Sequence, residues 1–130
     1  MADFHQNGVI STLHNLSNRS LDKIEHELRE YSKDAPIELI LPSLYSELKG
    51  DALKNIVSCL SNVKYLNHIT IGLDKADKSQ FIKAKKFFSS LNQSHSVIWN
   101  DSPKMKKLDN DFKKLGIAPT QPGKGKNVWY

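Results

Sequence analysis

The sequence predicts an α/β fold of three layers, in which a mainly parallel sheet lies between helices. The main observation is that segments of helical periodicity alternate three times with short apolar, β-branched runs. The second is size, because 130 residues with a hydrophobic fraction of 38% and a charged fraction of 25% suit one globular domain with a real core. Strands joined by helical crossovers pair in parallel, so a ligand crevice is expected at their carboxyl ends.

The first predicted element is an amphipathic helix that begins after Ser20 and ends near Ser32. Serine is a favoured N-cap, because its hydroxyl accepts from the free N–H groups of the first turn. Apolar residues then recur at helical spacing, namely Leu21, Ile24, Leu28 and Tyr31. Residues 1–35 therefore form an N-terminal helical extension ahead of the alternating region.

The first strand–helix–strand unit follows this extension. Residues 37–41 are apolar and β-branched, and Pro42 is expected to end that strand. A second helix is predicted behind Asp51, with an apolar stripe that reaches Leu60. Residues 68–73 form the second predicted strand.

The pattern then repeats. Asp77 with Gln80 three residues later resembles a capping box, which predicts the start of a third helix, and residues 96–99 form the third strand. Ser102 precedes a proline at the start of a fourth helix, and Gly116 stands where a C-terminal cap belongs. This order predicts a Rossmann-like α/β/α architecture, with its site in the loops that follow the three strands.

Charge is unevenly distributed along the chain. The net charge is +5 overall, but residues 51–130 hold 14 lysines against 6 acidic side chains, a net charge of +8. Such a balance favours an anionic partner. Because this stretch contains no arginine for reading base edges and no interleaved aromatic residues, a phosphate-bearing ligand fits better than a nucleic acid. A plain solvated lysine face is the alternative for most of these charges.

The sequence suggests a cytoplasmic protein. The first fifteen residues carry Asp3 and no continuous apolar stretch, and no segment approaches the ~20 apolar residues of a membrane span. The single cysteine, Cys59, has no disulfide partner, which agrees with a reducing compartment. It sits in the apolar register of the second helix, so burial is expected.

Candidate binding groups follow the predicted strands. After the first strand, Glu47 and backbone amides could hold the ribose and base of a nucleotide, or the segment could be an ordinary loop. After the second strand, Asp74 is expected to meet a ligand and Asp77 to cap a helix. After the third, Trp99 is expected in the core, while the two residues that follow it, Asn100 and Asp101, could reach the crevice or cap the next helix.

The segment Gly123-Lys124-Gly125 is suited to phosphate. Glycines allow a close backbone approach, and an ammonium group at the head of a helix adds positive charge. The spacing is not that of a P-loop, and a flexible basic loop is the alternative interpretation. The five histidines are scattered without ligand spacing, so no metal site is expected in this chain.

Three motifs in order give the sequence a resemblance to a known family. They are the segment from Leu41 to Glu47 (LPSLYSE), the segment Gly72-Leu73-Asp74, and the segment from Pro122 to Trp129 (PGKGKNVW). Together they resemble the N-terminal half of GT-A glycosyltransferases, most closely the glucosyl-3-phosphoglycerate and mannosylglycerate synthases. The resemblance covers about residues 37–130 and makes residues 36–130 a partial GT-A nucleotide-binding domain.

The resemblance implies a site and an activity. Its nucleoside-binding residues would be Pro42, Ser43, Leu44 and Glu47, with Asp74 on the base; near the phosphates would lie Gly123, Lys124 and Gly125. The implied reaction passes a hexosyl group from a nucleotide sugar to a small hydroxy acid such as glycerate or 3-phosphoglycerate. The sequence departs from the family at Tyr45, Ser46 and Leu73, which leaves the identity of the base open.

The family also uses groups that this sequence does not supply. A divalent cation, Mg²⁺ or Mn²⁺, is held by an Asp-x-Asp motif on the strand after the Gly-Lys-Gly helix, and the sequence ends before that strand. No catalytic residue is assigned, and because the Asp-x-Asp motif and the acceptor-binding half are absent, we expect a fragment that is inactive alone. The alternatives are a non-catalytic nucleotide- or anion-binding module and, third, a nucleic-acid-binding domain. An open sheet edge near Val128 also leaves a homo-oligomer as an option.

Overall fold

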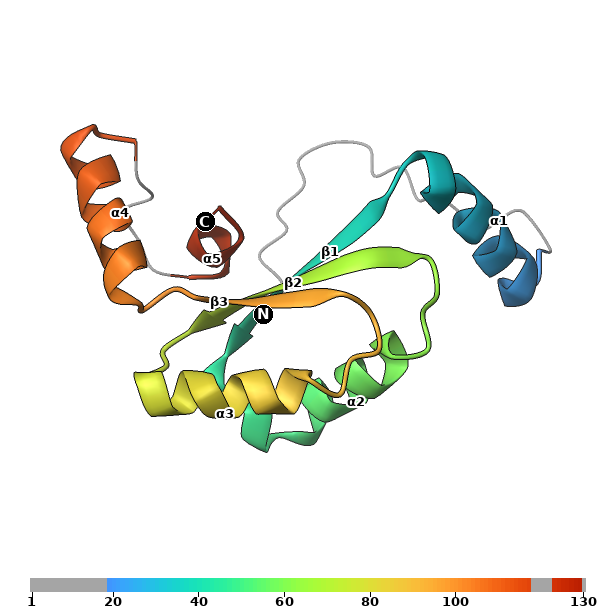
Figure 1. Cartoon of the computed structure of the whole chain (residues 1–130), viewed down its shortest axis with the longest axis horizontal. Helices are drawn as coiled ribbons and strands as arrows, with labels where there is room; N and C mark the ends of the chain where they lie inside the picture. Colours follow the sequence, from blue (N-terminus) through green and yellow to red (C-terminus); the bar gives the residue numbers. More distant parts are fainter. Residues whose placement is uncertain (1–18, 118–122, 130) are drawn as a thin grey trace, which may run out of the picture.

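The computed structural model describes residues 19–117 and 123–129, without the side chains of Lys124 and Trp129 (Figure 1). Its elements, in chain order, are α1 (Leu21–Asp34), β1 (Ile37–Leu44), the 3₁₀ helix η1 (Tyr45–Lys49), α2 (Asp51–Leu60), β2 (Leu66–Asp74), α3 (Lys78–Phe88), β3 (His95–Trp99), α4 (Pro103–Lys114) and α5 (Lys124–Trp129).

The three strands form one parallel sheet in the order β1-β2-β3, which confirms the predicted α/β class. Figure 1 shows α2 and α3 together on one face of the sheet and α5 on the other, where it contacts β1 and β2. A sequential strand order with crossovers of one hand places both crossover helices on the same face. The described residues therefore form helix, sheet and helix layers.

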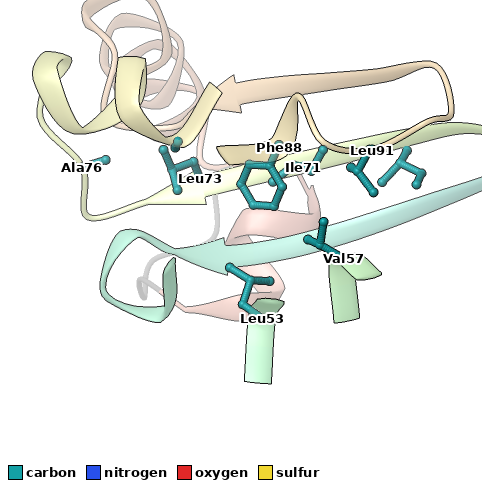
Figure 2. Close-up of a cluster of buried hydrophobic side chains, with 9 residues drawn as sticks. Leu53, Val57, Ile71, Leu73, Ala76, Phe88 and Leu91 are labelled. Atoms are coloured by element: carbon teal, nitrogen blue, oxygen red, sulfur yellow. The ribbon is translucent and has the colours of Figure 1, made fainter. Parts of the chain in front are cut away.

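The core lies between β2 and the two crossover helices (Figure 2). Because side chains alternate along a strand, Ile69, Ile71 and Leu73 point to one face of β2, and all three are fully buried. From α3, Phe88 packs against them and is also fully buried, and α2 adds Val57. The central strand is thus anchored by its odd-numbered residues, which leaves the even-numbered positions facing α5.

The first strand does not stop at Pro42, as the sequence suggested. It continues to Leu44, and Pro42 is paired in register with Gly72 of β2. Proline is tolerated because β1 is an edge strand, where a missing N–H can face the open side of the sheet. The correction matters for the site, because Ser43 and Leu44 belong to the rigid strand and not to a loop.

The predicted helix starts are confirmed. The side chains of Ser20, Asp77 and Ser102 each accept a hydrogen bond from the backbone N–H three residues later, and Gln80 completes the capping box with Asp77. The hydrogen bond from the backbone N–H of Gln80 is the main reason that the pKa of Asp77 is lowered, and this keeps its carboxylate charged. At the other end of α4, Gly116 has a φ of 69°, the left-handed conformation expected of a C-terminal cap.

Burial of Cys59 was predicted, and this prediction is wrong, since its side chain is exposed. In α2 only Leu53 and Val57 are buried, so the contact with the core is a narrow stripe of residues four apart. Cys59 lies two positions beyond Val57, which turns its side chain away from that stripe. The apolar periodicity of α2 therefore included positions whose side chains are not buried.

Two of the predicted apolar helix faces are only partly covered. In α1, Leu21 is 78% exposed and Tyr31 66% exposed, and in α4 Leu115, at the C-terminal cap, is 70% exposed. Figure 1 shows both helices away from the sheet faces, at opposite ends of the molecule. Other apolar residues on these faces, namely Ile24, Leu28, Met105 and Phe112, are half-buried. No helix in that part of the chain is long and apolar enough to cross a membrane.

Candidate functional site

A cleft of about 450 Å³ opens where β1, β2 and β3 end and where α4 and α5 begin. This is the carboxyl edge of the parallel sheet, the usual place for a ligand in such folds. The residues that line it are Pro42, Ser43, Leu44, Glu47, Asp74, Lys75, Asn100, Asp101, Met105, Lys106, Asp109, Gly123, Lys126 and Asn127.

Six of the eight residues proposed from the sequence line this cleft. They are Pro42, Ser43, Leu44, Glu47, Asp74 and Gly123. The fold therefore brings together the ends of two strands and the start of α5, which are separated by up to 81 positions along the chain. Gly125 is exposed and does not line the cleft, and the side chain of Lys124 lies outside the described residues.

The carboxylate of Glu47 is already engaged by the protein. Its Oε2 atom accepts a hydrogen bond of 2.9 Å from the backbone N–H of Leu44, as the reciprocal half of the cap on η1. The sequence interpretation had left both groups to a nucleoside. The observed bond means that Glu47 stabilises the turn after β1. The Leu44 N–H group cannot donate to a ligand as long as it donates to Glu47.

Asp74 is oriented by a neighbour that the sequence left open. The side-chain amide of Asn100 donates to its Oδ1 atom at 2.9 Å, and the backbone N–H of Asn100 donates to the carbonyl of Leu73 at 3.0 Å. Asp101 accepts from the backbone N–H of Ala76 at 3.0 Å. Asn100 and Asp101 therefore tie the end of β3 to the end of β2 and line the cleft, while Ser102 caps α4.

Trp99 packs against the core, as predicted. Its ring stacks on Phe81 with centroids 5.4 Å apart, and its indole N–H donates to the carbonyl of Ala76 at 2.7 Å. Near it in the cleft wall, Lys75 has a φ of 53°, which makes it the one non-glycine residue with a left-handed backbone in the part of the chain described. That conformation costs a non-glycine residue about 1 kcal/mol or more, and such strain is concentrated at functional loops.

Helix α5 is seated directly on the sheet through Asn127. This residue is 6% exposed, and its side-chain amide donates to the carbonyl of Gly72 at 2.9 Å. A Cβ atom on Gly72 would lie 1.8 Å from Asn127 Oδ1, so only glycine allows this approach. The sequence contained Gly72 within a family motif but gave it no role, because its reason lies in a contact 55 positions away.

An ion-pair cluster connects α4 to α5 at the cleft wall. Asp109 lies 2.7 Å from the Lys126 ammonium through Oδ1 and 2.6 Å from that of Lys113 through Oδ2. The Asp109 side chain is 14% exposed and that of Lys126 is 23% exposed, so solvent screens their pair less than an ordinary surface pair. Neither residue was proposed from the sequence; a second lysine directly after the Gly-Lys-Gly segment was the available signal.

The cleft offers two kinds of recognition chemistry. Carboxylates from Glu47, Asp74 and Asp101 can accept from hydroxyl or imide N–H groups, while the ammonium groups of Lys75, Lys106 and Lys126 can donate to phosphate. This mixture of acceptors and cations matches a ligand with a polar, N–H-bearing end and an anionic end.

The described residues contain no group of three or more His, Cys, Asp or Glu side chains placed to hold a metal ion. The sequence Asp109-Asn110-Asp111 has Asp-x-Asp spacing, but it lies on α4, where residues two apart point to different sides. Asp111 pairs with Lys114 at 3.6 Å, away from the pair of Asp109 with Lys126. These residues therefore do not fit a divalent cation.

Comparison with known proteins shows which sequences this chain is similar to. The chain is 45% identical over 129 residues to a glucosyl-3-phosphoglycerate synthase of Persephonella marina, and 34% identical over 130 residues to one of Methanococcoides burtonii. The matches cover 99% and 98% of this chain but only 32% and 31% of those proteins. No family model and no solved structure matches the chain.

The two matches agree in extent as well as in name. Each spans nearly every position of this chain, and each occupies about a third of the relative's own length. The expected similarity to glucosyl-3-phosphoglycerate synthases is thereby confirmed: nearly the whole of this chain is similar to about a third of two proteins of that name.

Proposed function

We propose that this chain is the nucleotide-sugar-binding part of a GT-A glycosyltransferase, which transfers a hexosyl group to a small phosphorylated or unphosphorylated hydroxy acid such as 3-phosphoglycerate or glycerate. The observation that carries the proposal is the similarity of nearly the whole chain to two proteins named glucosyl-3-phosphoglycerate synthase. The chain spans about a third of their length, so the complete activity would need further residues.

The cleft supports the binding half of this proposal. In our assignment the nucleoside lies against the end of β1 and the turn after it, at Pro42, Ser43, Leu44 and Glu47. Asp74 accepts from an N–H group of the base. Asn100 donates to Oδ1 of Asp74, which aims the carboxylate across the ends of the strands.

The phosphate end of the assignment lies at the start of α5. There the diphosphate would lie toward Gly123, Lys124 and Gly125, of which Gly123 lines the cleft. Glycines admit a close approach of phosphate oxygens to the backbone, and an ammonium group supplies the opposite charge.

A divalent cation is part of the proposal for the complete enzyme only. When bound, Mg²⁺ or Mn²⁺ would neutralise the diphosphate as it leaves the sugar. The described residues contain no cluster of three or more side chains that could hold it. A cytoplasmic location is likewise proposed, on the basis of the sequence.

A non-catalytic nucleotide- or anion-binding module is the second candidate. It is favoured by one observation, namely that the described residues contain a ligand-sized cleft but no cluster of three or more metal-ligating side chains. The two candidates predict the same nucleotide binding and differ in whether a longer protein that contains this chain turns over a sugar nucleotide.

Donor binding tests the proposal directly. Calorimetric titration of the chain with UDP- and GDP-glucose is expected to find weak binding that is tighter than the binding of the free nucleosides, because it depends on the diphosphate. Asp74→Ala and Lys124→Ala should each lower the affinity about tenfold, since each removes a charged hydrogen-bonding group. The Asp74 variant should also lose affinity for the free nucleoside, whereas the Lys124 variant should not. Unchanged affinity in both variants would remove these site assignments.

Catalysis provides a separate prediction. With Mg²⁺ or Mn²⁺ present, the chain alone is expected neither to transfer nor to hydrolyse the sugar of a bound donor, because the described residues hold no ligand set for the cation. The measurement is release of nucleoside diphosphate over time, with a heat-treated sample of the same preparation as control. Turnover that persists through a second purification step would contradict the prediction.

A further inference from the structure

The cleft wall contains a lysine that neither the motifs nor the proposed donor site assigns. Lys126 lies in the short helix α5, lines the cleft, and has its Nζ atom 2.7 Å from Asp109 Oδ1 on α4. Gly123, the residue that precedes α5, lines the same cleft. The ammonium group is thus held at the end of the site that faces the start of α5.

The charge balance of this cluster favours an incoming anion despite the ion pair. Asp109 is shared, because its second oxygen lies 2.6 Å from Lys113. One carboxylate between two ammonium groups gives these three side chains a net charge of +1. An ammonium group has three N–H donors, and the bond to Asp109 occupies one of them.

The same cluster restricts where Lys126 can be. A lysine side chain loses about 2 kcal/mol of rotamer freedom when it is fixed, and a ligand that finds it already fixed does not have to order it. Asp109 is 14% exposed and sits on a capped helix of twelve residues, so it is a firm anchor. Asn127, the next residue, is buried on the sheet and fixes the backbone of α5 beside Lys126.

We infer that Lys126 binds the phosphate-bearing end of the ligand, and that Asp109 is a positioning residue that holds its ammonium group in the cleft before the ligand arrives. The inference rests on the proposed function, because it requires a nucleoside diphosphate in the cleft. It adds a second cationic residue to the site and gives α4 a role in ligand binding.

Comparison of the affinities for a nucleoside diphosphate and for its nucleoside tests whether Lys126 acts on the phosphates or affects the whole site. The probes are UDP with uridine and GDP with guanosine, titrated calorimetrically into the chain. Lys126→Met should weaken diphosphate binding by about tenfold or more, since a charged hydrogen bond is lost, and should leave nucleoside affinity unchanged. Lys107→Met is the matched control, because it removes the same charge from an exposed position of α4 outside the cleft, and it should change neither affinity.

The Asp109→Asn variant distinguishes a positioning role from a simple electrostatic effect. Removal of a negative charge beside the cleft would by simple electrostatics strengthen anion binding. A positioning role predicts the opposite, a loss of about threefold to tenfold for the diphosphate alone. In the Lys126→Met background, adding Asp109→Asn should produce no further loss, because the side chain that Asp109 positions is absent.

The possible results separate the two proposals. If the unaltered chain binds neither UDP nor GDP, the proposed function fails, and this inference fails with it. If the chain binds UDP or GDP but Lys126→Met binds it equally well, only the inference is overturned. Tighter diphosphate binding by Asp109→Asn would overturn the positioning role of Asp109. Circular dichroism of each variant confirms that the fold is retained.

Discussion

Replacing Gly72 with alanine is expected to displace α5 from the sheet and to weaken nucleoside diphosphate binding by about tenfold or more. The new Cβ atom would lie 1.8 Å from Asn127 Oδ1 and 2.9 Å from its Cγ. Asn127 is buried and bonded to the Gly72 carbonyl, so it cannot rotate away without losing that bond. We expect a loss of stability of about 1–3 kcal/mol from overpacking, measured by urea unfolding.

A compensating variant tests the cause. Asn127→Ala alone loses only the hydrogen bond, whereas Gly72→Ala with Asn127→Ala removes the collision, so the double variant should be less destabilised than the two single losses added together. Gly50→Ala is the matched glycine control. There a Cβ atom would meet only the Glu47 carbonyl at an ordinary 3.5 Å. Full stability and affinity in Gly72→Ala would contradict the seating of α5 on this residue.

Truncation of Phe88 is expected to have the largest effect on stability. Its side chain is fully buried between α3 and β2, and it meets Phe87 edge-on with ring centroids 5.1 Å apart. Phe88→Ala should cost about 3–5 kcal/mol, because apolar burial is lost and a cavity remains. Domains of this kind have about 5–15 kcal/mol in total, so the variant should unfold at much lower urea concentration or be largely unfolded at 25 °C.

The control for this prediction lies on the same helix. Ile82 is 60% exposed, and Ile82→Ala should change the free energy of unfolding by about 0.5 kcal/mol or less. Comparison of the two midpoints by circular dichroism isolates the contribution of burial. Equal losses in both variants would mean that the core is not centred on the contact between α3 and β2.

Local chemistry made much of the fold predictable. The caps at Asp77 and Ser102 satisfy helix N–H groups within three residues, so their role can be inferred without knowing the rest of the chain. The alternation of apolar residues in β2 likewise determines which face is buried. Errors arose where the deciding contact is distant. Pro42 is tolerated within β1 because that strand is at the edge of the sheet, and Cys59 is exposed because α2 contacts the core through a narrow stripe.

The residues of the site were likewise predictable where local features indicate them, and not where a distant contact decides. The sequence by itself determined the parallel α/β class and the residues at the ends of the strands, such as Asp74, because strand ends and family motifs are local features of the chain. Only the tertiary structure decided that Asn100 orients Asp74, that Gly72 admits Asn127, and that Asp109 holds Lys126. Each of these contacts joins residues from different elements, 17 to 55 positions apart, and depends on how those elements are placed against one another. Periodicity reports which side of an element is apolar, but it carries no information about which other element lies opposite.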